Sequence, residues 1–458
     1  MDKKNRYDFT VGPPLGKLIG FALPFVAVMI LQNLYHTADA MVVGRFLGED
    51  ALAAVGASGQ VSSLVLMLIS GATTGMSVVV SQYFGAKDLV RLRKTIMTSL
   101  YMIVGLSAVF SILGAAFSRP LLALMGTPDN IMGGAAAYLR IIFLGSLATA
   151  VYNMANAISR ALGDSVTPLI VLVITALLNV GLDLLFVGPL RMGVAGAAYA
   201  TVLAAALSAA ACTVILVKKM PFIKPSPDAL RWDGQIAGAV VKIGFPSVLQ
   251  SSSMSLGNVL IQGIINSFGS TVIAAFSAAT KIDNLLSWPP GGFTNAMQYY
   301  TGQNIGAGKP ERIKDGVKAS LIVVIGYSAA AALVTIPFRA QLMGLFSAGE
   351  GGMVKIGAEY LLIVASFWSF AGINHLFKSI LTGAGDAMAA ICCNVAEMAV
   401  RLVLSLVLSR SMGYLGVFIA APCGWFAASV TGVLLYWRGR WKEKGVAGRT
   451  AAGPARLS

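Results

Sequence analysis

The stretches VSQYFGAKDLVRLRK at residues 80–94 and TGQNIGAGKPERIKD at residues 301–315 are two copies of one motif. They align at an offset of 221 positions, which places Gln82 opposite Gln303. Matches at offsets of 221 or 222 recur along the chain: GEDALAAVGA at 48–57 with GSTVIAAFSA at 269–278, Pro24 with Pro246, and ALGD at 161–164 with GAGD at 383–386. A repeat of this length predicts two copies of one structural unit in the same orientation.

The composition places this chain in a lipid bilayer. Of its 458 residues, 57% are hydrophobic and 12% are charged, and the mean hydropathy is +0.77. About twelve apolar stretches have the roughly 20 residues that cross a bilayer as a helix, and these runs lack the alternation of a barrel strand. The sequence therefore predicts an all-α polytopic membrane protein with about twelve transmembrane helices in two pseudo-symmetric six-helix lobes.

The span boundaries divide the chain into five parts. We expect a cytoplasmic N-terminal segment at 1–15, an N-lobe with spans 1–6 at 16–217, a cytoplasmic linker at 218–235 and a C-lobe with spans 7–12 at 236–437. The tail at 438–458 is basic and rich in Gly and Ala, and we expect it to be cytoplasmic and disordered.

The chain has a net charge of +15, and the distribution of its basic residues indicates how the chain is oriented in the membrane. Of the 34 Lys and Arg residues, 25 fall in the N-terminal segment, the even-numbered connections and the tail, whereas six fall in the odd-numbered connections. The positive-inside rule then predicts that both termini are cytoplasmic, in a multi-pass protein of the cytoplasmic (inner) cell membrane. Because this distribution explains the charge, we expect no nucleic-acid partner.

Span 1 carries a polar stripe on an otherwise apolar helix. Gln32, Tyr35, His36 and Asp39 lie three, four or seven residues apart and share one helical face. A lone carboxylate at membrane depth is costly, so this face is expected to look into the protein or a water-filled cavity and not into lipid.

Other spans of the N-lobe carry polar faces as well. Asn179 and Asp183 are four residues apart in span 5, Asn153 and Asn156 lie in span 4, and Thr201 lies in span 6. Two acids among neutral polar groups, with no obvious basic partner, are typical of a buried site for a cation, either a metal ion or a proton.

The repeat supplies an internal comparison for the two acids. Asp39 aligns with Leu260 or Ile261, and Asp183 aligns with Ser405, so neither acid is needed for a lobe to fold. The alternative is that each Asp is protonated and serves as a hydrogen-bonding contact between helices.

Five charged residues of the C-lobe are secondary candidates. Lys281 and Asp283 are two residues apart in span 8 and point away from each other. Glu397 and Arg401 are four residues apart in span 11, with the acid first, a spacing that lets them neutralise each other. His375, in the middle of span 10, is either a core histidine or a cavity residue.

Span 8 also contains SWPPGGFTN at 287–295. Pro289 and Pro290 lack backbone N–H groups, and Gly291 and Gly292 weaken a helix, so the stretch predicts a kink or a break. We consider it a candidate hinge.

These motifs together resemble those of the multidrug and toxic compound extrusion (MATE) transporters. The resemblance is carried by Pro24, YHTADAMVVGRFLG in span 1, the SQYFGA and GQNIGAG pair, SRALGD after span 4 and LLNVGLDLLF in span 5, and it covers about residues 10–440. It implies a proton- or sodium-coupled antiporter that exports drug-like, often cationic amphipathic, compounds by alternating access. It also implies a monomer with no cofactor besides the coupling ion.

On the matching positions, the resemblance implies an N-lobe ion site at Tyr35, Asp39, Asn179, Asp183 and Thr201, with Asn153 and Asn156 nearby. If the ion is sodium, Asp39, Asp183 and Asn179 are the implied metal ligands. Some branches of the family also use acids in spans 7 and 10. Here those regions read PSVLQSSSMSLGN and SFWSFAGINHLF, which contain no acid.

Other classes of protein fit less well. GQNIGAGKP at 302–310 lacks the spacing and the Ser or Thr of an ATP-binding phosphate loop, and the sequence has no H-E-x-x-H or G-x-S-x-G motif, so we expect no enzyme. A passive channel would not need an asymmetric acid site. A flippase for lipid-linked precursors remains the alternative, although such a protein would be expected to line its cavity with cations.

Overall fold

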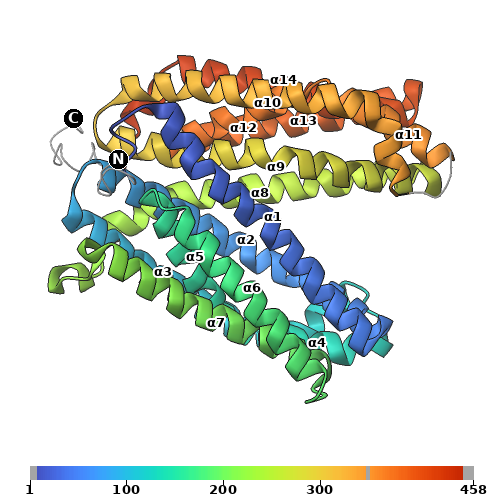
Figure 1. The fold of residues 1–458 in the computed structure, drawn as a ribbon, viewed down its shortest axis with the longest axis horizontal. Helices are drawn as coiled ribbons and strands as arrows, with labels where there is room; N and C mark the ends of the chain where they lie inside the picture. Colours follow the sequence, from blue (N-terminus) through green and yellow to red (C-terminus); the bar gives the residue numbers. More distant parts are fainter. Residues whose placement is uncertain (1–7, 347–350, 447–458) are drawn as a thin grey trace. The chain divides into compact units, whose positions relative to one another are not determined.

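The computed structural model describes residues 8–346 and 351–446, and their secondary structure is helical throughout (Figure 1). The helices of the first half are α1 (Pro14–Leu47), α2 (Glu49–Gly85), α3 (Leu89–Leu124), α4 (Asp129–Leu144), α5 (Ser146–Ala161), α6 (Val166–Val187) and α7 (Gly193–Lys219). Those of the second half are α8 (Gly234–Asn266), α9 (Ser270–Gly306), α10 (Pro310–Gly344), α11 (Gly352–Ala365), α12 (Trp368–Gly383), α13 (Ala387–Met412) and α14 (Tyr414–Trp437).

The two halves repeat the same succession of helices. α2 and α9 each contain 37 residues, and their bounds differ by the offset of 221 found in the sequence. α5 and α12 each contain 16 residues. The α4–α5 pair is bent by 50° and the α11–α12 pair by 52°, so even the broken helix recurs at the same place.

The lengths and compositions of the helices fit a membrane protein. Eight helices are long and apolar enough to cross a bilayer, and counting each bent pair as one span brings the number to ten. α8 and α9 are of spanning length too, with 33 and 37 residues, but are more polar. The predicted all-α polytopic fold is confirmed.

The chain divides into two compact units, whose boundaries fall inside helices. The N-unit comprises Ala27–Val248, and the C-unit comprises the described residues of Met1–Val26 and Leu249–Ser458. α1 and α8 therefore each contribute to both units. In each case the boundary follows by two residues a proline, Pro24 or Pro246, which removes a helical hydrogen bond.

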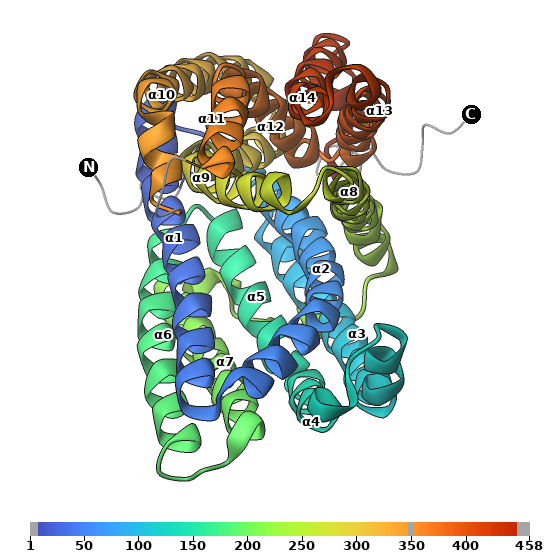
Figure 2. The same ribbon diagram turned by 90° about the vertical axis from the view of Figure 1, so that its right-hand side faces the viewer.

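The N-unit is built around α5, which packs against α2, α3 and α7 (Figure 2). A second core lies between α2, α3 and α4, where Leu122, Leu139 and Phe143 are buried. Gly114 of α3 allows this packing, because a Cβ atom there would lie 2.4 Å from the Phe143 ring.

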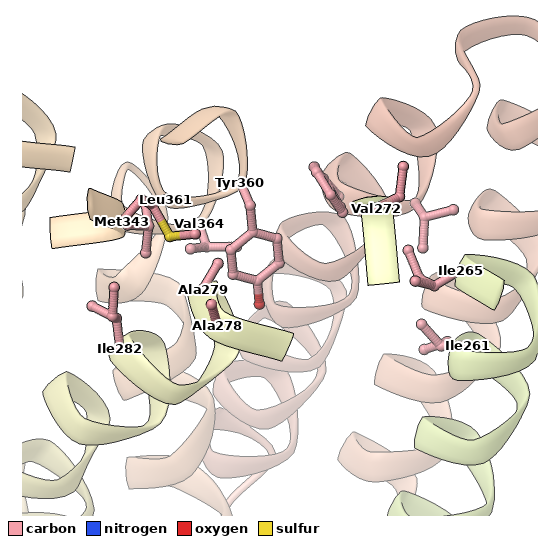
Figure 3. Close-up of a cluster of buried hydrophobic side chains, with 12 residues drawn as sticks. Ile261, Ile265, Val272, Ala278, Ala279, Ile282, Met343, Tyr360, Leu361 and Val364 are labelled. Atoms are coloured by element: carbon pink, nitrogen blue, oxygen red, sulfur yellow. The ribbon is translucent and has the colours of Figure 1, made fainter. Parts of the chain in front are cut away.

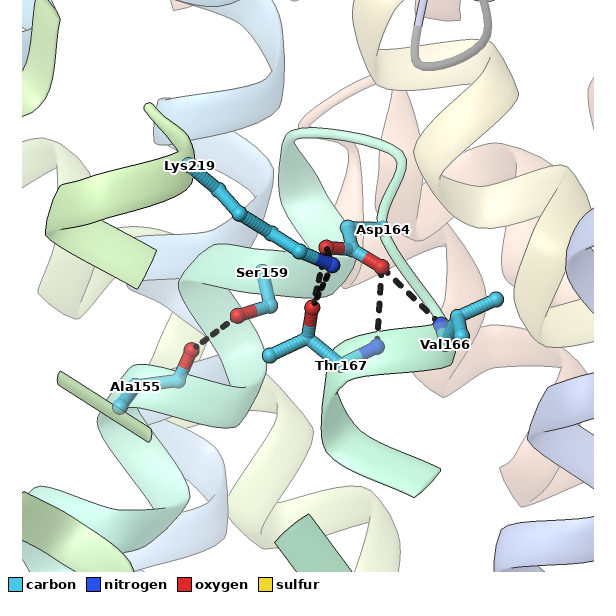
Figure 4. Close-up of polar contacts among 6 residues, drawn as sticks. All are labelled: Ala155, Ser159, Asp164, Val166, Thr167 and Lys219. Carbon is cyan, nitrogen blue, oxygen red and sulfur yellow. Dashed lines mark hydrogen bonds and ion pairs between the residues drawn. The ribbon is translucent and has the colours of Figure 1, made fainter. Parts of the chain in front are cut away.

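The motif SRALGD ends α5 and starts α6 (Figure 4). Asp164 Oδ1 accepts hydrogen bonds from the backbone N–H groups of Val166 and Thr167, both at 3.0 Å, and so satisfies donors that the first turn of α6 leaves free. Lys219, at the end of α7, lies 3.4 Å from Asp164 Oδ2. This motif is therefore explained by its role in joining three helices.

In the C-unit, α12 is the central helix, packed against α9, α10, α13 and α14. Its neighbours bury a cluster that includes Tyr360, Leu361 and Val364 of α11 and Ile282 of α9 (Figure 3). Such burial of apolar side chains and aromatic pairs fixes the helices relative to one another within the unit.

The second copy of the loop motif holds the chain ahead of α1. Gln303 Oε1 accepts a hydrogen bond from the Phe9 N–H at 2.9 Å, and Arg312 donates to the Gly12 carbonyl at 2.7 Å. In the N-unit, Arg93 donates to the carbonyl of Phe222 at 2.6 Å. Each copy of the motif thus holds the segment that precedes the helix shared by the two units.

The candidate hinge does not break its helix. α9 runs without interruption from Ser270 to Gly306, through Pro289 and Pro290. Because Pro290 has no N–H, the Leu286 carbonyl loses its helical donor, and the Tyr327 hydroxyl of α10 donates to it at 3.1 Å. Of the predicted kink or break, the break is therefore corrected, while the kink and the hinge role stay predictions.

The predicted linker and tail contain short ordered turns. The linker region holds η2 (Pro221–Ile223) and η3 (Pro227–Leu230). In the tail, η4 (Arg440–Glu443) buries Trp441, whose Nε1 donates to the Tyr436 carbonyl at 2.8 Å. The remainder of the predicted tail, 447–458, and residues 1–7 of the predicted N-terminal segment lie outside the described residues.

Candidate functional site

The two acids singled out in the N-lobe meet in the structure. Asp39 is on α1 and Asp183 is on α6, 144 positions later, yet their carboxyl groups lie within hydrogen-bonding distance of each other. Asp183 is fully buried and Asp39 is half-buried. Two carboxyl groups at this distance repel each other when both are ionised, and they can share a hydrogen bond when one carries a proton.

The pair has open hydrogen-bonding capacity. No donor in the described part of the chain reaches either carboxyl oxygen of Asp183 or Oδ1 of Asp39. Asn179, one helical turn before Asp183, is fully buried, and neither atom of its side-chain amide has a partner among the described residues. Unsatisfied buried polar atoms are costly, so this cluster is suited to receive a charged or polar ligand.

Two tyrosines and a threonine surround the acids. Tyr35 of α1 and Tyr138 of α4 both lie near the Thr201 hydroxyl of α7, and both are close enough to Asp39 and Asp183 for electrostatic interaction. His36 lies beside Asp39, and its ring is 5.1 Å from that of Tyr35. The sequence-predicted residues Tyr35, His36, Asp39, Asp183 and Thr201 are thus brought together.

Tyr138 was missed by the sequence analysis. It lies in AAAYL at 135–139, which aligns at an offset of 222 with GAEYL at 357–361 and therefore with Tyr360. Because the same residue stands in both halves, a comparison that searches for differences passes over it. The signal that could have found it is a polar side chain in an otherwise apolar stretch of span 4.

The remaining predicted N-lobe residues make other contacts. Asn153 donates to the Thr149 carbonyl at 2.9 Å, and Asn156 accepts from the Cys212 thiol at 3.5 Å. Gln32 is exposed on α1. These three residues do not hold the two carboxyl groups, although they lie on the helices that carry or neighbour them.

No described Lys or Arg of the N-unit pairs with Asp39 or Asp183, because its ion pairs join Arg91 to Asp88, Lys94 to Asp233 and Lys219 to Asp164. The described residues also hold no group of three or more His, Cys, Asp and Glu side chains that could bind a metal ion. What the site offers is two carboxyl groups, an amide and hydroxyls, which are ligands for a proton or a monovalent cation.

Asp283, the acid of α9, is held by neutral donors. It is buried, and it accepts hydrogen bonds from Trp368 Nε1 at 2.7 Å and from the Tyr360 hydroxyl at 3.2 Å. Arg401 is close enough to add a favourable charge. Lys281, two residues before Asp283, is exposed on the other side of the helix, as the spacing predicted.

Glu397 has a different cation partner from the one expected. Lys378 of α12 lies 3.5 Å from its Oε2, and both side chains are buried, while Asn374 donates to the same oxygen at 2.7 Å. Arg401 is near but donates to Asn258 at 3.1 Å. The ion pair expected between Glu397 and Arg401 is therefore corrected.

His375 projects from the central helix α12, next to Lys378 and Glu397. It is exposed, in contrast to its chain neighbours Asn374 and Leu376, which are buried. The side chain therefore lies on an open face of the C-unit and is not enclosed in its core.

The comparison with protein families agrees with the repeat. The MatE family model matches the chain twice, over residues 24–185 and 246–407. The chain belongs to the MatE family. The two matched segments lie 222 positions apart, as do the repeated motifs, so each half of this MatE protein is one copy of the family unit.

Relatives cover almost the whole chain. The probable multidrug resistance protein YpnP of Bacillus subtilis is 31% identical over 439 residues, which are 95% of this chain and 98% of that protein. The FAD transporter of Shewanella oneidensis is 23% identical over 420 residues, 89% of this chain and 91% of that one. This MatE protein is therefore a multi-pass membrane transporter and not an enzyme.

A solved structure has the same fold. A transporter of the MOP superfamily from Pyrococcus furiosus superposes with a TM-score of 0.86 at 23% identity, covering 97% of this chain and 99% of that chain. At this identity the likeness establishes the architecture of this MatE protein, and its site must be argued from its own residues.

Proposed function

We propose that this MatE transporter is a cation-coupled antiporter that exports drug-like, often cationic amphipathic, compounds by alternating access. The observation that carries the proposal is the pair of carboxyl groups of the half-buried Asp39 and the fully buried Asp183, which face each other with no described Lys or Arg paired to them. Removing two acids from water is costly, and a cation bound between them offsets that cost. The similarity to relatives such as the probable multidrug resistance protein YpnP supports the export of drugs.

In the proposed cycle, Asp39 and Asp183 take up a proton or a sodium ion from the outside. Loading removes the repulsion between the carboxyl groups and favours the N-unit conformation in which they are close together. The exported compound is released to the outside, and loss of the ion to the cytoplasm restores the other conformation. The ion drives transport to the extent that it binds one conformation more tightly than the other.

The residues present fit either coupling ion. For a proton, one carboxyl group donates to the other, as their distance allows. For sodium, oxygen ligands come from Asp39, Asp183 and the side-chain carbonyl of Asn179, an acceptor that has no partner among the described residues. We further propose that the protein works as a monomer in the inner cell membrane with both termini cytoplasmic, as the distribution of Lys and Arg supports.

The test is efflux of ethidium from proteoliposomes under an imposed proton or sodium gradient. We expect gradient-driven efflux by the wild type and its loss in Asp39→Asn. A matched control is Asp50→Asn, which changes an exposed acid of the same unit that is hydrogen-bonded to Asn130 at 3.1 Å, and it should retain efflux. Unchanged efflux in a folded Asp39→Asn variant would make this carboxyl group structural.

The identity of the ion can be measured without transport. A ligand that binds the folded protein raises its stability by about 2.7 kcal/mol at 100 times its Kd. If sodium is the coupling ion, the melting temperature of the purified wild type rises with sodium but not with an equal concentration of a large organic cation, and Asp183→Asn removes the rise. Identical melting curves in both salts would favour the proton.

Movement of a lipid-linked precursor in place of ethidium, driven by neither gradient, would favour the flippase alternative. The acidic N-unit site supports the antiporter over that alternative, because an anionic headgroup is repelled by carboxylates.

A further inference from the structure

A cation inside a long helix of the C-unit, Lys281, has no ion-pair partner among the described residues. Glu397 is neutralised by Lys378, and Asp283 is held by Tyr360 and Trp368 with Arg401 nearby. Among the described residues, no carboxylate forms an ion pair with Lys281, whose side chain is exposed. Within the described residues, the charge of Lys281 is therefore not neutralised by an ion pair.

Lys281 lies well inside its helix. It is eleven residues after the start of α9, about 16 Å along the axis. The repeat-equivalent helix α2, which has the same length, is apolar enough to span the membrane. An ionisable residue at such depth either faces a water-filled path or pairs with an opposite charge.

The exposed face of α9 is polar and has the character of a water-facing surface. Thr271, Ala274, Ser277, Lys281 and Asn284 recur every three or four residues and are all exposed. Among the described side chains of α9, the large apolar one that is exposed is Leu285, at 53%.

Its neighbour α10 shows what a lipid-facing surface of this protein looks like. The exposed residues of α10 include Ile322, Leu333, Val334 and Phe338, which are 72%, 75%, 61% and 55% exposed. Large apolar side chains of this kind suit the hydrocarbon core, whereas the hydroxyl, ammonium and amide groups of α9 do not. The α9 stripe therefore faces water or a ligand.

Comparison of the two halves shows that the charge of Lys281 distinguishes the α9 stripe from the equivalent face of α2. At the offset of 221, Lys281 corresponds to Gln60 of α2, and Asn284 corresponds to Ser63. Gln60 and Ser63 are also exposed, so the polar face is common to both units. The positive charge is the feature that the second copy adds, and it is not needed for the helix to form.

We propose that Ser277, Lys281 and Asn284 form an anion-recognition site for the transported compound. The Lys281 ammonium binds a carboxylate or phosphate group of the compound, and the Ser277 hydroxyl and the Asn284 amide donate hydrogen bonds to the same group. This rests on the proposed export function and extends its expected substrates to compounds that carry an anionic group, zwitterions included, which are bound more tightly than the corresponding cations. An ammonium beside neutral donors is the expected recognition chemistry for such a group.

The experiment compares two dyes that differ by one charge. Rhodamine B is a zwitterion with a free carboxylate, and rhodamine B ethyl ester is the corresponding cation. Binding of each to the purified full-length protein is measured by fluorescence anisotropy, and efflux of each is measured in proteoliposomes. We expect the wild type to bind the free acid more tightly, and Lys281→Gln to reduce this preference by about tenfold.

The choice of the test variant and two control variants keep the result interpretable. Lys281→Gln installs the residue of the repeat-equivalent position, Lys281→Arg keeps the charge and should keep the preference, and Gln60→Ala changes the equivalent position of the N-unit and should leave the preference unchanged. The inference is overturned if the wild type binds the free acid no more tightly than the ester. It is also overturned if Lys281→Gln lowers the affinity for both dyes equally or for neither.

The two proposals fail separately. If Asp39→Asn abolishes gradient-driven efflux of the ester while Lys281→Gln leaves the ratio of the two affinities unchanged, the antiporter proposal is supported and the anion-site proposal is refuted. If no gradient drives efflux but the preference for the free acid depends on Lys281, the anion-site proposal is supported and the proposed ion coupling is refuted.

Discussion

The buried acids of the two units are treated in opposite ways. In the N-unit, Asp39 and Asp183 face each other and no Lys or Arg of the described residues pairs with them, whereas in the C-unit Glu397 has Lys378 and Asp283 has two donors and Arg401. The repeat explains the contrast, because Lys378 and Arg401 stand at the positions of Asn156 and Asn179. The C-unit thus has cations where the N-unit has neutral amides, and its acids stand at other positions of the repeat.

The largest expected effect follows from removing the cation that the C-unit supplies. Lys378→Met leaves the Glu397 carboxylate buried and without its ion-pair partner, which typically costs about 3–5 kcal/mol of unfolding free energy. We expect a marked drop in the melting temperature of the detergent-purified protein. Asn156→Met, at the equivalent position of the N-unit, removes no charge and should cost less.

A double variant sharpens this expectation. Adding Glu397→Gln to Lys378→Met removes the unpaired charge and should recover part of the loss, because a buried ion pair replaced as a whole is often nearly neutral. Purely additive losses would show that Lys378 and Glu397 are not energetically coupled.

The next effect compares the two repeat-equivalent tyrosines. Tyr360→Phe removes a hydrogen bond to the buried Asp283 carboxylate, for which we expect a cost of about 1.5–3 kcal/mol. Tyr138→Phe removes a hydroxyl near the neutral Thr201 hydroxyl and should cost about 1 kcal/mol or less. Melting temperatures of the two variants give the comparison, and a larger loss at Tyr138 would contradict it.

A change in the N-unit acids should spare stability and remove function. Asp183→Asn replaces one of two mutually repelling groups with an amide that can donate to Asp39, so the unfolding free energy should stay the same or rise by about 1 kcal/mol. Gradient-driven efflux should be lost. A strong destabilisation would indicate that Asp183 is a structural hydrogen-bonding group after all.

The sequence predicted the features that are visible within a single helix or in the alignment of the two halves. The repeat, the apolar spans, the polar stripe ending at Asp39 and the opposed faces of Lys281 and Asp283 are all local patterns with a period of 3.6 residues or a fixed offset. It could not pair Glu397 with Lys378, because that partner comes from another helix and spacing within span 11 favoured Arg401.

The continuity of α9 escaped prediction for the same reason. Two prolines and two glycines weaken the helix locally. The Tyr327 hydroxyl that donates a hydrogen bond to the freed Leu286 carbonyl, however, belongs to α10. Helix propensity describes only the segment itself, and the neighbouring helix supplied what the segment lacks.

The smallest effect tests this compensation in α9, where the N-unit counterpart α2 has Leu68 and Ile69 in place of Pro289 and Pro290. Tyr327→Phe leaves the Leu286 carbonyl without its donor and should lower the unfolding free energy by about 1 kcal/mol. Tyr101→Phe removes a similar bond, to the Leu230 carbonyl at 3.0 Å, but that bond is exposed and water can replace it, so its loss should be nearly neutral. Equal melting temperatures for the two variants would mean that the freed carbonyl in α9 finds another donor. A loss confined to Tyr327→Phe, accompanied by altered ethidium efflux, would link the proline stretch to transport as well as to helix stability.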